Sequence, residues 1–133
     1  MTKKLLICPG ADAGERAGSV AEALGGGWEV SAAEFAADGG ASAPARIAQA
    51  LTEIEAAALE DRPDAVLLDG DDEATLAAAL VFAKLVVPMI RLRGDGEASQ
   101  DGALAERLCD VVVENEGPEA IAFAVRERLR ADR

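Results

Sequence analysis

The sequence predicts an α/β protein in which helices cover both faces of one parallel β-sheet, a three-layer α/β/α sandwich. Five short apolar runs alternate with helical patterns along the 133 residues, and strict alternation of this kind is typical of a parallel sheet. Four of the five runs are continuously apolar, as expected of strands that are buried on both faces. The length suits one domain, so we expect a single domain over 1–133.

Each expected strand is a short apolar run that stops at a turn signal. KKLLIC stops at Pro9 and Gly10, and AVLL stops at a cluster of acids. Pro88 stands at the entry of the fourth strand, where its missing N–H donor is tolerated. WEVSAAEF alternates, which predicts a strand with one less buried face. In chain order, the expected strands span 3–8, 28–35, 65–68, 87–92 and 110–114.

Each expected helix carries apolar residues at helical spacing. Val20 and Leu24 are four residues apart in the first helix, which the GGG run at 25–27 ends. Pro118 suits the first position of the last helix. In chain order, the expected helices span 15–24, 45–60, 72–86 and 103–108, and a fifth starts at 117–118.

The third expected helix, 72–86, is unusual because it has no polar residue from Leu76 to Ala83. A helix that is apolar all round requires burial on every face. Two interpretations are open. Neighbouring helices of the same chain could cover it, or it could also form an interface with a second copy or another protein.

Composition and charge exclude several functions. With 13 basic and 25 acidic residues, the net charge is −12, a field that repels nucleic acids and anionic membranes. No apolar run is long enough for a signal peptide or a membrane span. Cys8 and Cys109 lie beside apolar runs, which predicts buried thiols in a reducing compartment. We therefore expect a cytoplasmic protein. The absence of His excludes a Ser-His-Asp triad and His-ligated zinc.

The turns that follow the strands should gather at the carboxyl edge of the sheet, where ligands bind in open α/β folds. In PGADAG, Gly10 and Gly14 precede a helix, so backbone N–H groups there could hold a phosphate. Asp12 would oppose an anion at that place. A purely structural turn is the alternative.

Four acids, Asp69, Asp71, Asp72 and Glu73, crowd the turn after the third strand. Asp72 suits the N-cap of the next helix, and Glu73 suits its first turn. Asp69 and Asp71, together with Asp12, could hold Mg²⁺, or two of them could act as acid and base. Simple solvation in a loop is the third interpretation. No cofactor is expected.

Two arginines, Arg91 and Arg93, follow on the fourth strand, one residue apart. In extended structure such side chains point to the same face. They could neutralise the acids, or they could bind a phosphate of a ligand. An internal ion pair would account for them equally well.

The segment RPDAVLLDGDDEATLAAALVFAKLVVPMIRL resembles the middle of the N-terminal half of the non-hydrolysing UDP-N-acetylglucosamine 2-epimerases. Pro63-Asp64, Gly70-Asp71, Thr75, the Ala run and Pro88 follow the order and spacing of that family. The resemblance implies a GT-B-type, Rossmann-like domain associated with nucleotide sugars, in which Asp71 takes a catalytic position. The ligand-binding residues that we expect on this basis are Gly10, Asp12, Gly70, Thr75, Arg91 and Arg93.

The chain also departs from this family. Where the family has a Gly-Thr-Arg-Pro-Glu turn after the first strand, this chain has PGADAGE. Where the family has His-x-Glu-Ala-Gly, this chain has Arg91-Leu92-Arg93-Gly94, so an Arg stands at the position of the family's catalytic Glu. Within these 133 residues, we find no segment that resembles the second domain of the family. These departures predict a non-catalytic domain that acts through self-association or a partner protein and keeps a vestigial nucleotide-sugar cleft. The alternative is an enzyme subunit that a second chain completes, with Asp71 as acid/base on a UDP-sugar.

A weaker likeness connects the chain with response-regulator receivers. PDAVLLD and the segment from Pro88 onward are similar to the third strand and the last strands of those domains. This resemblance implies that Asp69 would be a phosphoacceptor, with Mg²⁺ as its ion. The chain departs from the receiver pattern at two places. CPGAD stands where receivers have an acidic pair after the first strand, and Glu114 or Asn115 stands where they have a lysine on the last strand.

Overall fold

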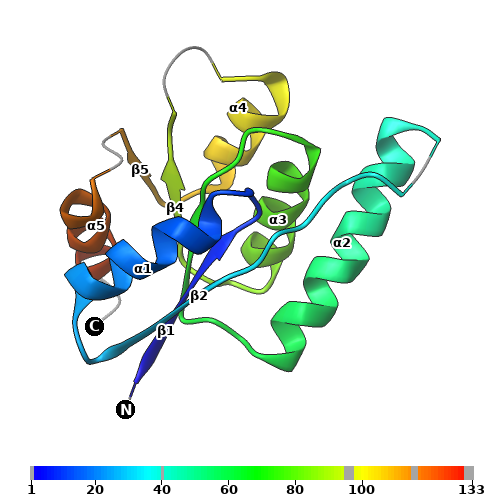
Figure 1. Cartoon of the computed structure of the whole chain (residues 1–133). Coiled ribbons are helices and arrows are strands. Elements are labelled where there is room, and N and C mark those ends of the chain that lie inside the picture. The colour runs from blue at the N-terminus through cyan, green and yellow to red at the C-terminus, as the bar shows by residue number, and fades with distance from the viewer. Residues whose placement is uncertain (1, 40, 95–97, 115–116, 131–133) are drawn as a thin grey trace.

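The computed structural model describes residues 2–39, 41–94, 98–114 and 117–130. Five parallel strands form one sheet in the order β2-β1-β3-β4-β5, and five helices connect and flank them, which confirms the predicted α/β/α architecture (Figure 1). The strands are β1 (Lys3–Cys8), β2 (Trp28–Ala32), β3 (Ala65–Leu68), β4 (Met89–Leu92) and β5 (Val111–Val113). The helices are α1 (Ala13–Leu24), α2 (Ala43–Glu60), α3 (Glu73–Lys84), α4 (Gln100–Leu108) and α5 (Pro118–Arg130).

Two apolar clusters, one on each face of the sheet, form the core. Helices α1 and α5 cover one face, and α2, α3 and α4 form the layer on the other. Strand β3 contributes to both, because Leu67 joins the first cluster and Val66 and Leu68 join the second, as alternate residues of a strand do. Within the described residues, no helix combines the length and the apolar character that a membrane span requires.

The element bounds differ from the sequence prediction mainly where side chains cap a helix or an edge strand leaves the sheet. Helix α4 begins near 100 because Ser99 Oγ accepts a hydrogen bond from Gly102 N at 3.0 Å. Strand β2 ends at Ala32, short of the expected residue 35. The next residues still follow β1, since Ala33 N and Phe35 N donate to the carbonyl oxygens of Ile7 and Pro9.

Helix α3 lies between α2 and α4, with the sheet beneath it. This position explains its apolar character, because neighbours of the same chain cover most of its surface. Leu80 and Leu85, at the C-terminal part of this helical segment, remain only partly covered. The residues of α3 that are buried are Ala74, Thr75, Ala77, Ala78, Ala79, Val81 and Phe82.

Val86 occupies a position that usually belongs to glycine. It follows α3 with a φ of 58°, in the left-handed region. Val86 N donates to Ala83 O and Val87 N donates to Phe82 O, which is the hydrogen-bond pattern of a Schellman C-cap. A β-branched residue is strained there, and its side chain gains little from packing because it is 81% exposed.

We expect Val86→Gly to raise the free energy of unfolding by about 1 kcal/mol, because glycine adopts the left-handed conformation without the steric cost. Val86→Ala keeps a Cβ atom and should gain less. Urea denaturation of the three proteins measures the difference. A less stable Val86→Gly protein would show that the strain assigned to this residue is absent.

Candidate functional site

In doubly wound α/β sheets ligands bind where the strand order reverses, which in this chain is at the carboxyl ends of β1 and β3. These strands are neighbours, and the chain leaves β1 toward α1 on one face and β3 toward α3 on the other. Gly10 N donates to Asp69 Oδ1 at 2.8 Å, so the two turns touch. A Cβ atom on Gly10 would stand 2.8 Å from the same oxygen, so the contact requires glycine. The structure thus brings together the β1 and β3 turns, including Gly10 and Gly70, as the parallel topology predicts.

Asp71 fastens the β3–α3 turn to the start of α4. Its Oδ1 atom accepts a hydrogen bond from Arg91 Nη2 at 3.0 Å, and its Oδ2 atom accepts one from Ser99 N at 2.9 Å. Ser99 Oγ also donates to Asp71 O at 2.5 Å. A Cβ atom on Gly102 would overlap Asp71 Oδ1, so α4 begins directly against this carboxylate. Each carboxylate oxygen of Asp71 therefore accepts a hydrogen bond from the chain itself.

Arg91 is buried beneath these turns, with 2% of its surface exposed. Besides Asp71, it donates through Nη1 to the carbonyl oxygens of Leu68, Gly70 and Leu92. The position of a buried cation depends on such partners, because an uncompensated charge in the interior is costly. The internal ion-pair interpretation therefore describes the contacts of Arg91.

Arg93 lies one residue further and makes different contacts. It forms a bidentate pair with Glu106, at 3.0 Å and 2.6 Å, and a further pair with Glu114 at 2.6 Å. The two arginines of the motif therefore serve different carboxylates, and Arg93 connects β4 with α4 and the end of β5. The pKa of Glu106 is lowered by its hydrogen bonds to Arg93.

Thr75 and Asp72 form a capping box at the start of α3. Asp72 Oδ1 accepts from Thr75 N and from Thr75 Oγ1, each at 3.0 Å, and Asp72 N donates to Thr75 Oγ1 at 3.3 Å. The predicted N-cap role of Asp72 is thus confirmed. The Thr75 side chain is fully buried, and Gly70 packs so closely on it that a Cβ atom at Gly70 would overlap the hydroxyl. In this conformation Thr75 stabilises the helix start.

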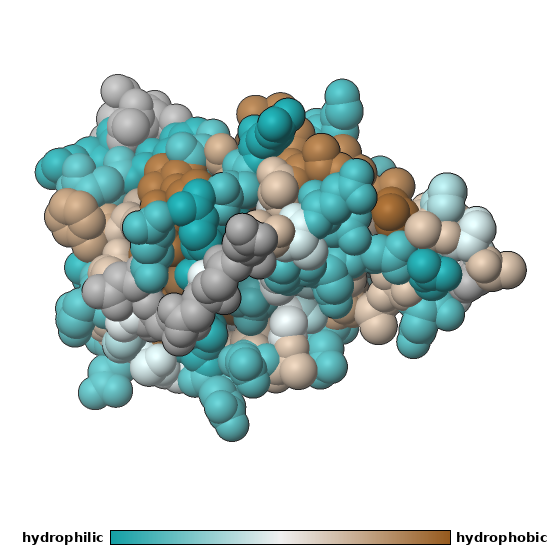
Figure 2. All heavy atoms as spheres, turned by 90° about the horizontal axis from the view of Figure 1, so that it is seen from above, coloured by the Kyte–Doolittle hydropathy of each residue, from teal (hydrophilic) through white to brown (hydrophobic). Residues whose placement is uncertain are grey.

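A small cavity lies at the ends of β1 and β2, beside the N-terminus of α1. Its volume is about 210 Å³. Asp12 is exposed at the N-cap of α1 and makes no side-chain capping hydrogen bond. Figure 2 looks onto this edge of the molecule, which is hydrophilic over most of its surface with separate apolar patches. The lining residues are Gly10, Ala11, Ala13, Gly14, Ala32, Ala33 and Glu34.

The three carboxylates considered for Mg²⁺ have different surroundings. Asp69 contacts Gly10, Asp71 contacts Arg91 and Ser99, and Asp12 is exposed to solvent. Over the described ranges, no group of three or more Asp, Glu or Cys side chains is arranged so that it could hold a metal ion.

The two cysteines are unpaired thiols in partly or fully buried positions. Burial raises the pKa of Cys8, and it raises the pKa of Cys109 to about 12. Because the thiolate is the nucleophilic form, neither side chain is an activated nucleophile near neutral pH.

Burial raises the pKa of Asp69 above its ordinary value of 3.8, although the hydrogen bond from Gly10 N and the charge of Arg16 oppose the rise. The folded protein therefore holds this proton more tightly than the unfolded chain. The stability that Asp69 contributes is fully present below the unfolded pKa and is lost as the pH rises through the folded pKa.

We expect Asp69→Asn, which keeps an oxygen for Gly10 N and removes the charge, to become more stable relative to the wild type as the pH increases above about 4. Denaturant unfolding of both proteins across a pH series measures this difference. A difference that stays constant with pH, or that falls, would contradict the assignment of the raised pKa to Asp69.

Two contacts that shape the site were missed by the sequence analysis. Ser99 stands in a polar loop, and its only visible signal is that Gln100 and Asp101 follow it as a helix start would. Arg46 of α2 holds Glu73 through two hydrogen bonds, at 2.8 Å and 3.1 Å, and these lower the pKa of Glu73. Both contacts connect residues far apart in the sequence, so local patterns do not reveal them.

The strand order and the layers define this chain as a Rossmann-like α/β domain. Neither a protein-family model nor a curated protein sequence matches it. Solved structures of UDP-GlcNAc 2-epimerases share the fold, and the chain spans about two fifths of their length. The predicted resemblance to part of these enzymes is confirmed at the level of structure.

Three of these structures illustrate the match. The S. aureus MnaA–UDP co-structure has a TM-score of 0.66 and 17% identity, covering 92% of this chain and 41% of that one. The Neisseria meningitidis enzyme bound to UDP-GlcNAc has a TM-score of 0.66 and 12% identity, covering 93% and 43%. The Methanocaldococcus jannaschii enzyme in complex with UDP-GlcNAc and UDP has a TM-score of 0.62 and 17% identity, covering 96% and 43%.

Proposed function

We propose that this chain is a non-catalytic, Rossmann-like binding domain of the cytoplasm. In this proposal it keeps a small nucleotide-sugar cleft at its carboxyl edge and acts together with a second polypeptide through the helix predicted over 72–86. The observation that carries the proposal is the environment of Asp71, whose two carboxylate oxygens are bonded to Arg91 and Ser99. The two free cysteines of the chain agree with the proposed cytoplasmic location, because the cytoplasm is a reducing compartment.

A general acid or base needs an oxygen within hydrogen-bond reach of the substrate proton. Oδ1 of Asp71 faces a permanently charged guanidinium, and Oδ2 faces a backbone N–H. Proton transfer through Asp71 would compete with the contacts that hold α4 to the β3–α3 turn. Asp71 is therefore better suited to a structural role than to catalysis.

The proposed ligand site is the cavity beside α1. Gly14 leaves space over the first turn of α1, whereas Gly10 N already donates to Asp69 Oδ1. The N-terminus of a helix favours negative groups. Its volume of about 210 Å³ is below the usual range for small-molecule sites, so it would accommodate a phosphate or a ribose and leave the remainder of a UDP-sugar outside. Glu34 in the lining and the net charge of −12 oppose an anion, and we therefore expect weak binding.

Phosphorus NMR of UDP-GlcNAc incubated with the purified chain tests the non-catalytic role. We expect no second nucleotide sugar to form at any protein concentration. If the wild-type chain converted UDP-GlcNAc to its 2-epimer and the Asp71→Asn variant did not, the proposal would be overturned. It would favour the alternative in which the chain is an enzyme subunit with Asp71 as acid/base.

The phosphoacceptor alternative has less support. Asp69 follows β3, as the receiver resemblance requires, but its Oδ1 atom is already bonded to Gly10 N and burial raises its pKa. Within the described residues, no third carboxylate joins Asp69 and Asp12 to hold the ion that such a switch needs. The binding-domain proposal accounts for more of the contacts at this edge.

A further inference from the structure

A small pocket opens at the edge of the sheet where β4 begins, opposite the cavity beside α1. Its volume is about 160 Å³, which is below the usual range for small-molecule sites and suits a single aliphatic side chain. Val86, Pro88 and Leu108 supply apolar parts of its wall. Val86 and Leu108 are exposed to solvent, so the pocket presents apolar surface outward.

Val86 holds its place in this wall at a conformational cost. Its φ of 58° lies in the left-handed region, where a β-branched side chain is strained. The side chain is exposed, so packing within the chain offsets little of that cost. Residues with such strain cluster at functional sites. The strain therefore indicates that the methyl groups of Val86 contact something outside the chain.

Arginine side chains reach the surroundings of the pocket from different elements. Arg128 of α5 lines the pocket itself. Arg62, in the turn before β3, donates a hydrogen bond through Nη2 to the carbonyl oxygen of Leu85 at the end of α3. Arg107 stands in the last turn of α4, directly before Leu108 of the pocket wall. Their charges therefore add at this edge of the molecule.

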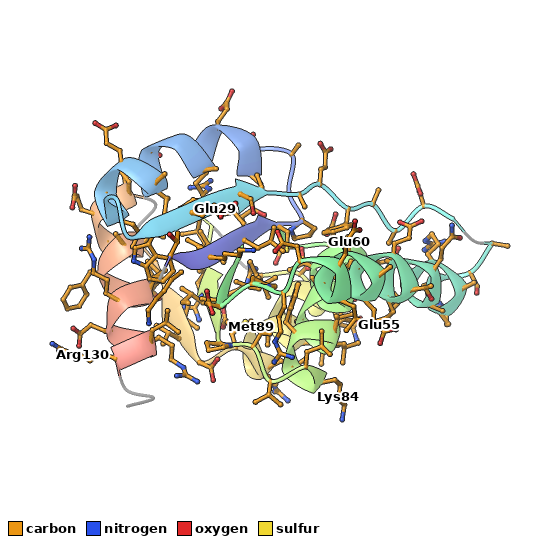
Figure 3. All side chains as sticks on the ribbon, turned by 90° about the horizontal axis from the view of Figure 1, so that it is seen from below. Glu29, Glu55, Glu60, Lys84, Met89 and Arg130 are labelled. Carbon is orange, nitrogen blue, oxygen red and sulfur yellow. The ribbon has the colours of Figure 1, made fainter. Side chains whose placement is uncertain are left out.

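Lys84 adds a further positive charge from the last turn of α3, and Figure 3, which looks onto this edge, shows its side chain extending away from the protein. Among the ion pairs between described residues, none includes Lys84 or Arg107. Asp110 is the acid in the lining, and it is already paired, because it accepts from Met89 N at 2.8 Å and lies 3.5 Å from Arg128. The pocket is therefore locally positive on a chain of net charge −12.

We propose that this pocket binds a partner protein through an acidic segment that carries an aliphatic side chain. The aliphatic side chain enters the pocket against Val86 and Leu108, and carboxylates beside it pair with Lys84 and Arg107. The net charge repels an acidic segment from most of the chain, so the local bases also determine where it docks. The inference rests on the proposed function, because Val86 ends the helix predicted over 72–86 and the partner is the second polypeptide.

An amide NMR titration of the labelled chain with the capped peptide Glu-Glu-Leu-Leu-Glu-Glu tests this docking site. We expect saturating shifts at Val86, Val87, Leu108 and their neighbours, with a dissociation constant of about 1 mM. The matched peptide Glu-Glu-Ala-Ala-Glu-Glu should bind about tenfold more weakly, because it fills less of the pocket. No shifts, or shifts only at other sites, would overturn the inference. Shifts at the pocket that depend on the concentration of the chain alone would identify a second copy as the occupant and overturn the assignment to another protein.

Val86→Gly separates binding from stability. The substitution removes the apolar side chain together with the backbone strain. It should therefore bind the leucine peptide about tenfold more weakly, although the folded chain becomes more stable. Unchanged peptide binding by Val86→Gly would show that the side chain serves no partner, and the inference would fail.

A pair of charge reversals tests the electrostatic part. Lys84→Glu should weaken binding of the leucine peptide about fivefold or more. Lys3→Glu is its matched control, because it changes the net charge equally but lies at the start of β1, two strands away from β4. This control should bind the peptide nearly as the wild type does. Equal losses in the two variants would mean that net charge alone governs binding, which contradicts a local docking site.

The outcome is separable from the proposed nucleotide-sugar cleft. The cavity beside α1 lies at the carboxyl edge of the sheet, whereas the pocket of Val86 lies at the opposite edge. We therefore expect Val86→Gly to bind UDP as the wild type does. UDP binding without peptide binding contradicts only the docking site, and peptide binding without UDP binding contradicts only the cleft.

Discussion

Replacing Phe82 by alanine should lower the free energy of unfolding by about 3–5 kcal/mol, the largest effect that we expect of any single substitution here. Phe82 is fully buried in the cluster between the sheet and α2, α3 and α4, where Ile54, Leu68 and Met89 also lie. Removing the ring takes away its transfer free energy and leaves a cavity that neighbouring backbone elements cannot close. Urea denaturation followed by circular dichroism measures the loss.

Phe123 provides the matched control. It is also a phenylalanine on a helix, α5, but 65% of its surface is exposed. Phe123→Ala should therefore change the stability by no more than about 0.5 kcal/mol. Similar losses for the two substitutions would show that α3 does not occupy the centre of its layer, and the packing described for this face of the sheet would then be wrong.

The second large effect concerns Asp71, whose replacement by alanine should cost about 2 kcal/mol. The substitution leaves the buried guanidinium of Arg91 without its carboxylate and Ser99 N without its acceptor. The full penalty for breaking a buried pair is larger, but the Asp71 side chain is 47% exposed and Arg91 keeps three carbonyl partners. Both facts reduce the expected loss.

Asp12→Ala is the control for this substitution, because Asp12 lies at the same edge, is exposed and makes no capping hydrogen bond. Its effect should stay within about 0.5 kcal/mol. Thermal and urea unfolding of both variants provide the comparison. If Asp71→Ala were as stable as Asp12→Ala or the wild type, the structural role of Asp71 would be refuted and its availability for chemistry would have to be reconsidered.

Local sequence patterns predicted the sheet well, because burial on both faces leaves a direct signature in the strands. The expected strands 3–8 and 65–68 coincide with β1 and β3, and Asp72 is the N-cap of α3 as expected. The expected strand 28–35 was too long because β2 is an edge strand, whose alternating pattern continues while the chain already departs toward α2. Apolar periodicity cannot locate the end of such a strand.

The site could be predicted only in part. The parallel topology alone places the turns of β1 and β3 at one edge, and their contact through Gly10 and Asp69 agrees with that expectation. The partners of the two arginines could not be predicted from their spacing. Arg91 and Arg93 are only two residues apart, but Arg91 pairs with Asp71 in the β3–α3 turn and Arg93 pairs with Glu106 in α4. Ser99 contacts Asp71 across 28 residues, a separation at which single-sequence patterns carry no information about contacts.

An amide NMR titration of the isotopically labelled chain with UDP tests the central claim, that the carboxyl edge beside α1 is a remnant ligand cleft. We expect shifts that saturate at millimolar UDP and are confined to Gly10, Gly14 and Ala33 and their neighbours, with the amides of α5 unchanged. Uridine without phosphate should produce smaller shifts, because the helix N-terminus binds the anionic group. Unchanged spectra, or shifts confined to the opposite edge of the sheet, would contradict the account.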